Sequence, residues 1–194
     1  TQHAPRKITL TSKDTAIPVF KRHYLVPTYT KSKKESLTLE VFSEILGNPS
    51  TGMLFEEFVK NKKLATSASA YYYPDGFGHT SFTISIIPKK NVSLEEIEIY
   101  LDEYLNKIKK KVFNKEELQK IKKRLVNDTI FAQDSLYMGM RIFGSSLTTG
   151  YSLKEINNWP NDIAKVSIDD LETYIPNIFN KKNSVTGYLL PIKE

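Results

Sequence analysis

The sequence predicts an α+β fold in which helices are layered on one face of a mostly antiparallel sheet. Residues 64–73 and 80–87 alternate with a period of two around Pro74-Asp75-Gly76, a pattern that predicts an antiparallel hairpin. Helix-start signals recur between residues 93 and 170, each followed by apolar residues at helical spacing. Because strands and helices alternate irregularly, a doubly wound parallel sheet is disfavoured.

Three further strands complete the predicted sheet. Residues 6–11 alternate weakly, and residues 19–26 alternate more clearly before Pro27. Residues 184–190 form the last predicted strand of the chain.

Two helices are expected between the second strand and the hairpin. Ser32 and Glu35 fit a capping box, and an apolar stripe follows until Gly47-Asn48-Pro49 stops the helix. A second, short helix is expected over residues 52–61.

The remaining helices follow the hairpin, and Ser93 with Glu96 opens the first of them. Asn114 and Glu117 repeat this signature before an apolar pattern so long that we expect a helix bent near Gly139 or Gly144. Ser152 to Glu155 opens another helix, which Trp159-Pro160 disturbs or ends, and Ser167 starts the last one.

Length and composition indicate one folded domain over residues 1–194, with residues 1–17 as a leading segment and first strand and residues 18–194 as the core. The chain begins with Thr rather than Met, so we expect a longer natural polypeptide. No apolar run has the length of a membrane span, and the first residues carry no apolar signal core.

The net charge of +6 raises the question of a nucleic-acid partner. Its lysines fall in pairs and triplets such as Lys109-Lys110-Lys111, on predicted helices that also carry glutamates. This arrangement is typical of solvated helix faces, and no RNA-binding aromatic signature accompanies it. We therefore expect no nucleic-acid partner.

The sequence carries no pattern of an independent active site. Cysteine is absent, and His3, His23 and His79 are scattered without a His or Glu partner at helical spacing, so no metal site is predicted. There is no Gly-x-Ser-x-Gly elbow, and Gly76-Phe77-Gly78 lacks the third glycine of a dinucleotide site. We predict no catalytic residue in this chain.

Several stretches together resemble the carboxy-terminal, non-metal-binding half of M16 zinc peptidases of the pitrilysin-like and mitochondrial-processing-peptidase-like kind. The resemblance spans nearly the whole chain and depends on the order and spacing of its motifs. The matching stretches are residues 20–29 (FKRHYLVPTY), 40–46, 50–55, 59–71 (VKNKKLATSASAY), 132–135, 147–150, Trp159-Pro160, 163–167 and 184–191 (SVTGYLLP).

The resemblance implies paired α+β halves that enclose a chamber, with zinc held by a His-x-x-Glu-His motif on the amino-terminal half. The expected partners are that zinc-bearing half, in the same polypeptide or as a separate subunit, and a peptide substrate. A homodimer is also compatible with the family. The resemblance favours a periplasmic location, with the cytoplasm as the alternative.

In many relatives this half contributes an Arg and a Tyr that reach the substrate near the zinc. Here the resemblance places Val59 and Thr66 at those positions, so direct help to catalysis is not expected. Tyr71, Tyr73 and Arg141 are the candidate substrate-binding residues. The alternatives are that the tyrosine pair belongs to the core and that Arg141 is a solvated charge.

The resemblance thus implies the substrate-chamber half of a zinc-dependent endopeptidase that acts on peptides or unfolded segments. On this interpretation the chain is inactive alone and binds no cofactor. The alternative is a non-catalytic M16-like assembly subunit.

Overall fold

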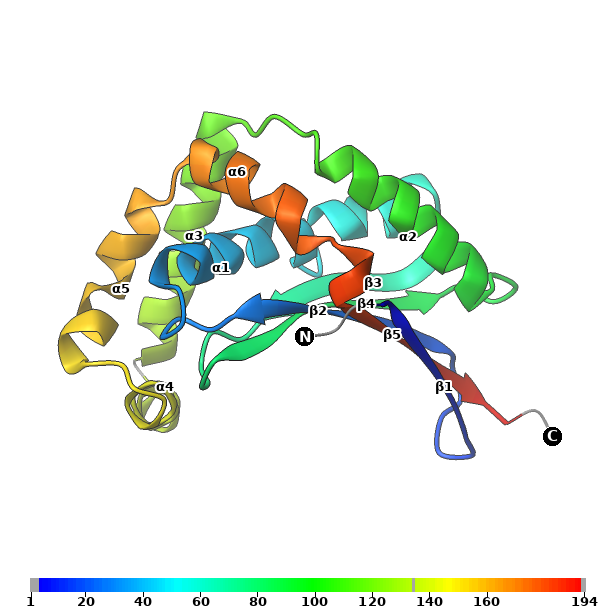
Figure 1. The fold of residues 1–194 in the computed structure, drawn as a ribbon, viewed down its shortest axis with the longest axis horizontal. Coiled ribbons are helices and arrows are strands. Elements are labelled where there is room, and N and C mark those ends of the chain that lie inside the picture. Colours follow the sequence, from blue (N-terminus) through cyan, green and yellow to red (C-terminus); the bar gives the residue numbers. More distant parts are fainter. Residues whose placement is uncertain (1–3, 134, 193–194) are drawn as a thin grey trace.

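The computed structural model describes residues 4–133 and 135–192, which form one five-stranded sheet and the helices around it (Figure 1). The strand order is β1-β5-β2-β4-β3, which places β2 at the centre. The strands are β1 (Arg6–Ser12), β2 (Val19–Pro27), β3 (Ala65–Tyr72), β4 (His79–Pro88) and β5 (Ser184–Pro191).

All strand pairs but one are antiparallel. β4 lies between β2 and β3, and the predicted hairpin is formed with Ala70 opposite Ile84. β5 pairs antiparallel with β2, while β1 runs parallel to β5 at the sheet edge. The predicted α+β class with a mostly antiparallel sheet is therefore confirmed.

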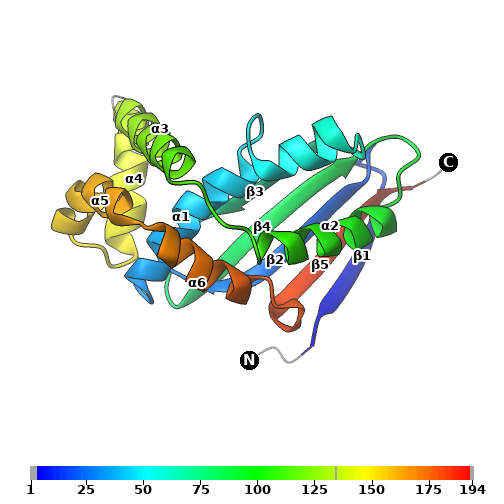
Figure 2. The ribbon, with the colours of Figure 1, turned by 90° about the horizontal axis from the view of Figure 1, so that it is seen from above.

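The helices fall into two groups. Seen from above in Figure 2, α1 (Lys33–Gly47), α2 (Leu94–Ile108) and α6 (Ile168–Ile178) lie over one face of the sheet. At one end of the sheet, α3 (Lys115–Gln133), α4 (Leu136–Thr148) and α5 (Leu153–Lys165) gather together (Figures 1 and 2). A 3-10 turn, Lys181–Asn183, leads into β5.

The long helix that the sequence predicted is interrupted, and the predicted bend near Gly139 or Gly144 is wrong. The regular structure stops after Gln133 and restarts at Leu136, and both glycines lie inside α4. Ser135 caps the new helix, because its side chain accepts a hydrogen bond from the Met138 amide. A serine at this position satisfies an otherwise free helical amide and so favours a new start over a bend.

The capping box predicted at Ser93 forms, and the predicted helix starts at Ser152 and Ser167 carry capping boxes as well. The one predicted at Ser32 does not form, because its side chain makes no capping hydrogen bond. The first turn of α1 is held instead by two ion pairs. Lys33 Nζ lies 2.7 Å from an Asp162 carboxylate oxygen, and Lys34 Nζ lies 2.6 Å from an Asp170 carboxylate oxygen. These ion pairs fix the start of α1 against α5 and α6.

Pro160 does not end α5, which continues to Lys165. A proline inside a helix removes one backbone hydrogen bond. Here the capping box at Ser152 and the buried side chains of Ile156 and Ile163, on either side of Pro160, hold the helix together.

The short helix before β3 is a π-helix, η1 (Phe55–Asn61), rather than a regular α-helix. Before this helix, α1 ends at Gly47, whose backbone packs directly against β3 of the sheet. A side chain at Gly47 would place its Cβ 2.1 Å from the Ala70 carbonyl oxygen, so only glycine allows this close approach.

The core lies between the sheet and α1, α2 and α6. Phe42 of α1 is its aromatic centre, with ring centroids 5.6 Å from Phe82 and 5.9 Å from Phe179. The ring of Tyr24 packs edge-on against Phe179 at 5.2 Å. These contacts join the central strands to the chain that follows α6.

One arginine is buried within this core. Arg22 of β2 faces the helices beside Phe20 and Tyr24 and is 1% exposed. Its Nε donates to Thr186 Oγ1 at 2.9 Å, and its two terminal nitrogens lie 2.5 Å from Glu98 and from Asp102 of α2. A buried guanidinium is tolerated because each of its three nitrogens has an ionic or hydrogen-bonding partner.

The same network extends to both neighbouring strands. Tyr188 of β5 donates to Glu98 at 2.6 Å, and Lys7 of β1 pairs with Glu98 at 3.0 Å. Burial raises the pKa of Glu98, but the hydrogen bonds from Tyr188 and Lys7 and the charge of Arg22 hold it below its usual value overall. Glu98 is therefore ionised at neutral pH and links α2 to three strands.

We predict that Arg22→Met destabilises the fold by about 3–5 kcal/mol, because Glu98 and Asp102 would lose their buried cation. The matched control is Arg141→Met on α4, where the arginine is exposed and the change should stay within about 0.5 kcal/mol. Urea unfolding followed by circular dichroism measures both. Equal losses for the two variants would contradict the role of Arg22.

Candidate functional site

The sheet face opposite α1, α2 and α6 is left open by the described residues (Figure 1). On β3 the core takes Ala68, Ala70 and Tyr72, so the alternate residues point to the open face. Tyr71 is half-buried there, and Tyr73, just beyond the strand, is 62% exposed. Their ring centroids are 5.5 Å apart, so the structure brings the two candidate tyrosines together outside the core.

Tyr71 begins a row of side chains that crosses the open face. The strand register places it opposite Thr83, which lies opposite His23, and His23 lies opposite Val185. His23 Nδ1 and Thr83 Oγ1 are 2.8 Å apart. Burial, with the nearby charge of Lys21, lowers the pKa of His23, which favours the neutral imidazole at pH 7. Thr83 is only 1% exposed and its hydroxyl is engaged with His23, so the accessible groups of the row are the Tyr71 ring and the partly exposed His23 imidazole rather than charges.

Exposed apolar side chains flank this row on the same face. Leu25 of β2 is 52% exposed, and Ile8 and Leu10 of β1 are about 60% exposed. Side chains of this kind on an uncovered sheet face provide packing area for another polypeptide. The open face can therefore bind a chain by shape and apolar contact.

The other sequence candidates lie elsewhere. Arg141 is exposed on α4, and no hydrogen bond, ion pair or ring contact among the described residues joins it to Tyr71 or Tyr73. Val59 packs partly buried against the core, and Thr66 Oγ1 donates to the Ile87 carbonyl at 3.2 Å. Val59 has no polar side-chain group, and the Thr66 hydroxyl is engaged with the sheet backbone.

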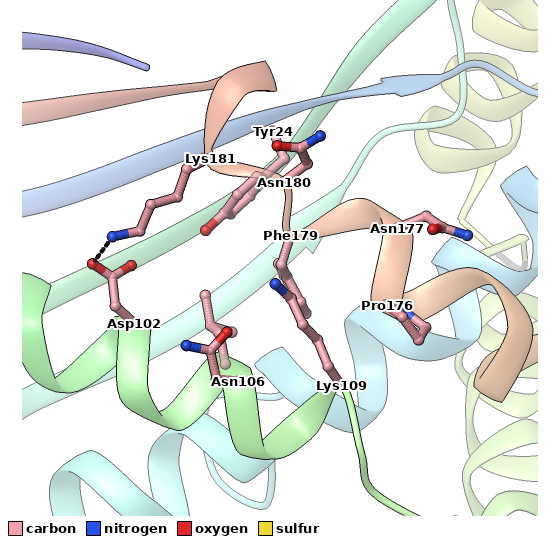
Figure 3. A pocket seen from close by; sticks show the side chains of 10 residues that line it. Tyr24, Asp102, Asn106, Lys109, Pro176, Asn177, Phe179, Asn180 and Lys181 are labelled. Carbon is pink, nitrogen blue, oxygen red and sulfur yellow. Dashed lines mark hydrogen bonds and ion pairs between the residues drawn. The ribbon is translucent and has the colours of Figure 1, made fainter. Parts of the chain in front are cut away.

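A polar cavity of about 410 Å³ lies on the helix side of the sheet, between the carboxy-terminal ends of α2 and α6 (Figure 3). Amide side chains, Lys109 and Lys181 surround the aromatic rings of Tyr24 and Phe179. The full lining is Tyr24, Asp102, Leu105, Asn106, Lys109, Pro176, Asn177, Phe179, Asn180 and Lys181.

Asp102, the one carboxylate among the described lining residues of this cavity, is already engaged. Asp102 lies 2.5 Å from Lys181 Nζ (Figure 3) and also pairs with Arg22. Burial raises the pKa of the Tyr24 hydroxyl, so this group stays protonated at neutral pH. The cavity therefore offers hydrogen bonds but has neither a free general base nor an activated nucleophile among its described residues.

The histidines do not form a metal site. Among the described residues, no group of three His, Asp or Glu side chains is placed to hold a metal ion. His23 and His79 belong to different strands, and His3 lies outside the described residues. No described helix is both long and apolar enough to cross a membrane.

Sequence reasoning missed a second cavity, of about 240 Å³, which contains Glu40 and Trp159. Glu40 interrupts the apolar run of α1 between Leu39 and Val41, both fully buried. A glutamate inside a buried apolar run is the only feature of the nearby sequence that could have indicated this cavity. Its partner Trp159 comes from a helix 119 residues later, so the sequence alone did not connect the two.

We predict opposite outcomes for two neighbouring tyrosines of β3. Tyr72→Ala should destabilise the fold by about 3–5 kcal/mol, because it empties a core position and removes a hydroxyl that donates to the Pro27 carbonyl at 2.7 Å. Tyr73→Ala should change stability by about 0.5 kcal/mol or less, since its ring lies on the open face. Thermal unfolding distinguishes them, and a large loss for Tyr73→Ala would place that ring in the core instead.

Comparison with solved structures shows the same fold in several bacterial proteins. A protease from Helicobacter pylori is 22% identical with a TM-score of 0.86, over 98% of this chain and 45% of that chain. The inactive peptidase domain of a Bordetella parapertussis protein is 14% identical with a TM-score of 0.81, over 95% of this chain and 96% of that chain. The peptidase M16 inactive domain from Pseudomonas fluorescens is 12% identical with a TM-score of 0.74, over 99% of this chain and 44% of that chain.

No curated protein matches the chain. The chain spans less than half the length of the Helicobacter pylori protease that it matches. The family profile described as the peptidase M16 inactive domain matches residues 2–125. Because this match covers more than half of the 194 residues, the chain belongs to the M16 peptidase family, as an inactive domain of that family.

Proposed function

We propose that this chain is the substrate-chamber half of a zinc-dependent endopeptidase that acts on peptides or unfolded segments. The zinc site belongs to a separate amino-terminal half with a His-x-x-Glu-His motif, on the same polypeptide or on a partner subunit. The observation that carries the proposal is the match to the M16 inactive domain. A domain described as inactive implies that another part of the peptidase performs the chemistry.

The open sheet face supports this role. It presents Tyr71 and Tyr73 together with Leu25 and the exposed residues of β1, while the opposite face is filled by the core. A surface of this kind can line a chamber and hold an extended peptide through aromatic and apolar contacts. Tyr71 and Tyr73 are accordingly the proposed substrate contacts. Arg141 stays a prediction, because none of its described contacts links it to this face.

The length of related chains supports a second half. The chain covers 45% of the Helicobacter pylori protease and 44% of the Pseudomonas fluorescens chain, which leaves room in each for a further domain of similar size. Zinc is the cofactor that this further half would hold. There it would lower the pKa of a bound water and so supply the nucleophile for peptide hydrolysis.

The alternative function is a non-catalytic assembly subunit of the same family. One observation favours it: Val59 and Thr66 lack the charged and phenolic groups that many relatives place near the zinc. Both functions leave the isolated chain inactive, so only its behaviour with a zinc-bearing half separates them.

We predict that mixing this chain with the separately expressed amino-terminal half produces hydrolysis of an unstructured fluorogenic peptide. Neither half should be active alone, and a chelator should abolish the activity of the pair because the water nucleophile needs the metal. Elemental analysis checks that zinc is bound to the partner half. A pair that contains zinc but cleaves none of a varied peptide set would favour the assembly subunit.

In the active pair, Tyr71→Ala and Tyr73→Ala should each raise KM by about threefold to tenfold with little change in kcat, since they remove substrate contacts far from the metal. Thr66→Ala is the matched control on the same strand and should leave both constants unchanged. If the tyrosine variants lower kcat while KM is unchanged, the rings act on the reaction itself and not on binding.

A further inference from the structure

The cavity of about 240 Å³ lies where α1, α3, α4 and α5 meet the turn between β3 and β4. This is the end of the molecule at which the second group of helices gathers (Figure 1). Its lining is half-buried rather than sealed, so a solute can reach it. The residues are Glu40, Pro74, Asp75, Thr129, Ile142, Ser146, Tyr151, Glu155, Ile156 and Trp159.

Besides the Tyr151 hydroxyl, which is buried and has no hydrogen-bond partner among the described residues, this cavity has unused hydrogen-bonding capacity at Glu40. Its Oε2 accepts a hydrogen bond from Trp159 Nε1 at 2.8 Å, whereas its Oε1 is buried and has no hydrogen-bond partner. Burial, together with the nearby charge of Asp75, raises the pKa of Glu40 to about 8. The carboxyl is therefore mostly protonated at pH 7 and ionises above about pH 8, where an unpaired buried carboxylate oxygen is destabilising and a cationic donor would relieve it.

Two more carboxylates line the cavity, from two other elements. Asp75 accepts a hydrogen bond from Ser145 Oγ at 2.5 Å, and Glu155 accepts from the Ser152 amide at 2.9 Å as the cap of α5. No lysine or arginine is among the described lining residues. The nearby Lys33 is already paired with Asp162 at 2.7 Å. The cavity thus gathers three carboxyl groups, with Glu40 ionised above about pH 8, and no cation among its described lining residues.

The walls between these carboxylates are apolar and aromatic. The Tyr151 ring is held in place by stacking on Tyr29, with centroids 4.1 Å apart and planes at 13°. The Trp159 indole is fixed by its hydrogen bond to Glu40, and Ile142, Ile156 and Pro74 provide aliphatic surface. Such walls suit a ligand with an apolar stem and a flat cationic head.

We propose that this cavity binds the arginine side chain of a peptide segment. The guanidinium donates to the free Oε1 of Glu40 and is attracted by the charges of Asp75 and Glu155, while its stem packs between the aromatic and aliphatic walls. Arginine fits better than lysine because its planar head both stacks on aromatic rings and presents several donors in a fixed geometry. This binding is independent of zinc and of the tyrosines on the open sheet face.

Trp159 is the single tryptophan of the chain and lies in the cavity, so its fluorescence reports occupancy directly. The probe is the peptide acetyl-Ala-Arg-Ala-amide, titrated into the chain at low salt and pH 9, where Glu40 is ionised and arginine is still cationic. The control peptide carries citrulline in place of arginine, which keeps the shape but removes the charge. We expect a saturable fluorescence change with the arginine peptide and binding about tenfold weaker with the citrulline peptide.

Glu40→Gln tests the residue itself, because glutamine can still accept the Trp159 hydrogen bond but carries no charge. It should weaken binding of the arginine peptide about tenfold. Glu103→Gln, an equal change of charge at an exposed position of α2, should leave it unchanged. Circular dichroism verifies folding, and Asp75→Asn replaces Glu40→Gln as the test if the latter does not fold.

Three results would overturn the proposal. The first is no saturable change at millimolar arginine peptide, and the second is equal binding of the arginine and citrulline peptides. The third is unchanged affinity in the folded Glu40 variant, or in the Asp75 variant where that one decides. None of these results depends on peptidase activity, so failure here and failure of the proposed function are distinguishable.

Discussion

The buried guanidinium of Arg22 is the interaction that ties the layers of this fold together. It stands on the central strand and reaches Thr186 of β5 and two carboxylates of α2, one of which also binds Lys7 of β1 and Tyr188. Such a charge is stable inside a protein only if every partner is in place, so the network specifies the position of α2 over the sheet as well as stabilising it. A shift of β2 by one residue would bury Lys21 and expose Phe20, which makes the register of the sheet unambiguous.

That register also decides which side chains are available for function. With Phe20, Arg22 and Tyr24 on the helix side, His23 and Leu25 are directed to the open face, where β3 adds Tyr71. The proposed chamber wall is therefore the reverse side of the core. Changes to the open face should alter substrate binding with little effect on stability, because few of its side chains are needed for packing.

The second group of helices provides a different kind of surface. The open face offers shape, aromatic rings and apolar area, which suit an extended polypeptide of varied sequence. The cavity around Glu40 combines a free carboxylate oxygen with aromatic walls, which suits one positively charged side chain. The two proposed sites would thus hold a peptide loosely over a wide face and one arginine more selectively at the end of the sheet.

Local patterns in the sequence were sufficient for the fold class, the β3–β4 hairpin and the helix starts at Ser93, Ser152 and Ser167, because these depend on neighbours within a few residues. The period of two also showed that Tyr71 and Tyr73 share a face. It could not show which face the helices cover, since that depends on packing between distant segments. The same limit explains the continuation of α5 through Pro160, where buried side chains outweighed the local pattern. The new helix start at Ser135 has a local cause, a cap that competed with the long apolar pattern. The partners of Arg22 lie 76 to 164 residues away and Trp159 lies 119 residues from Glu40, so only the tertiary structure could bring these charges and rings together.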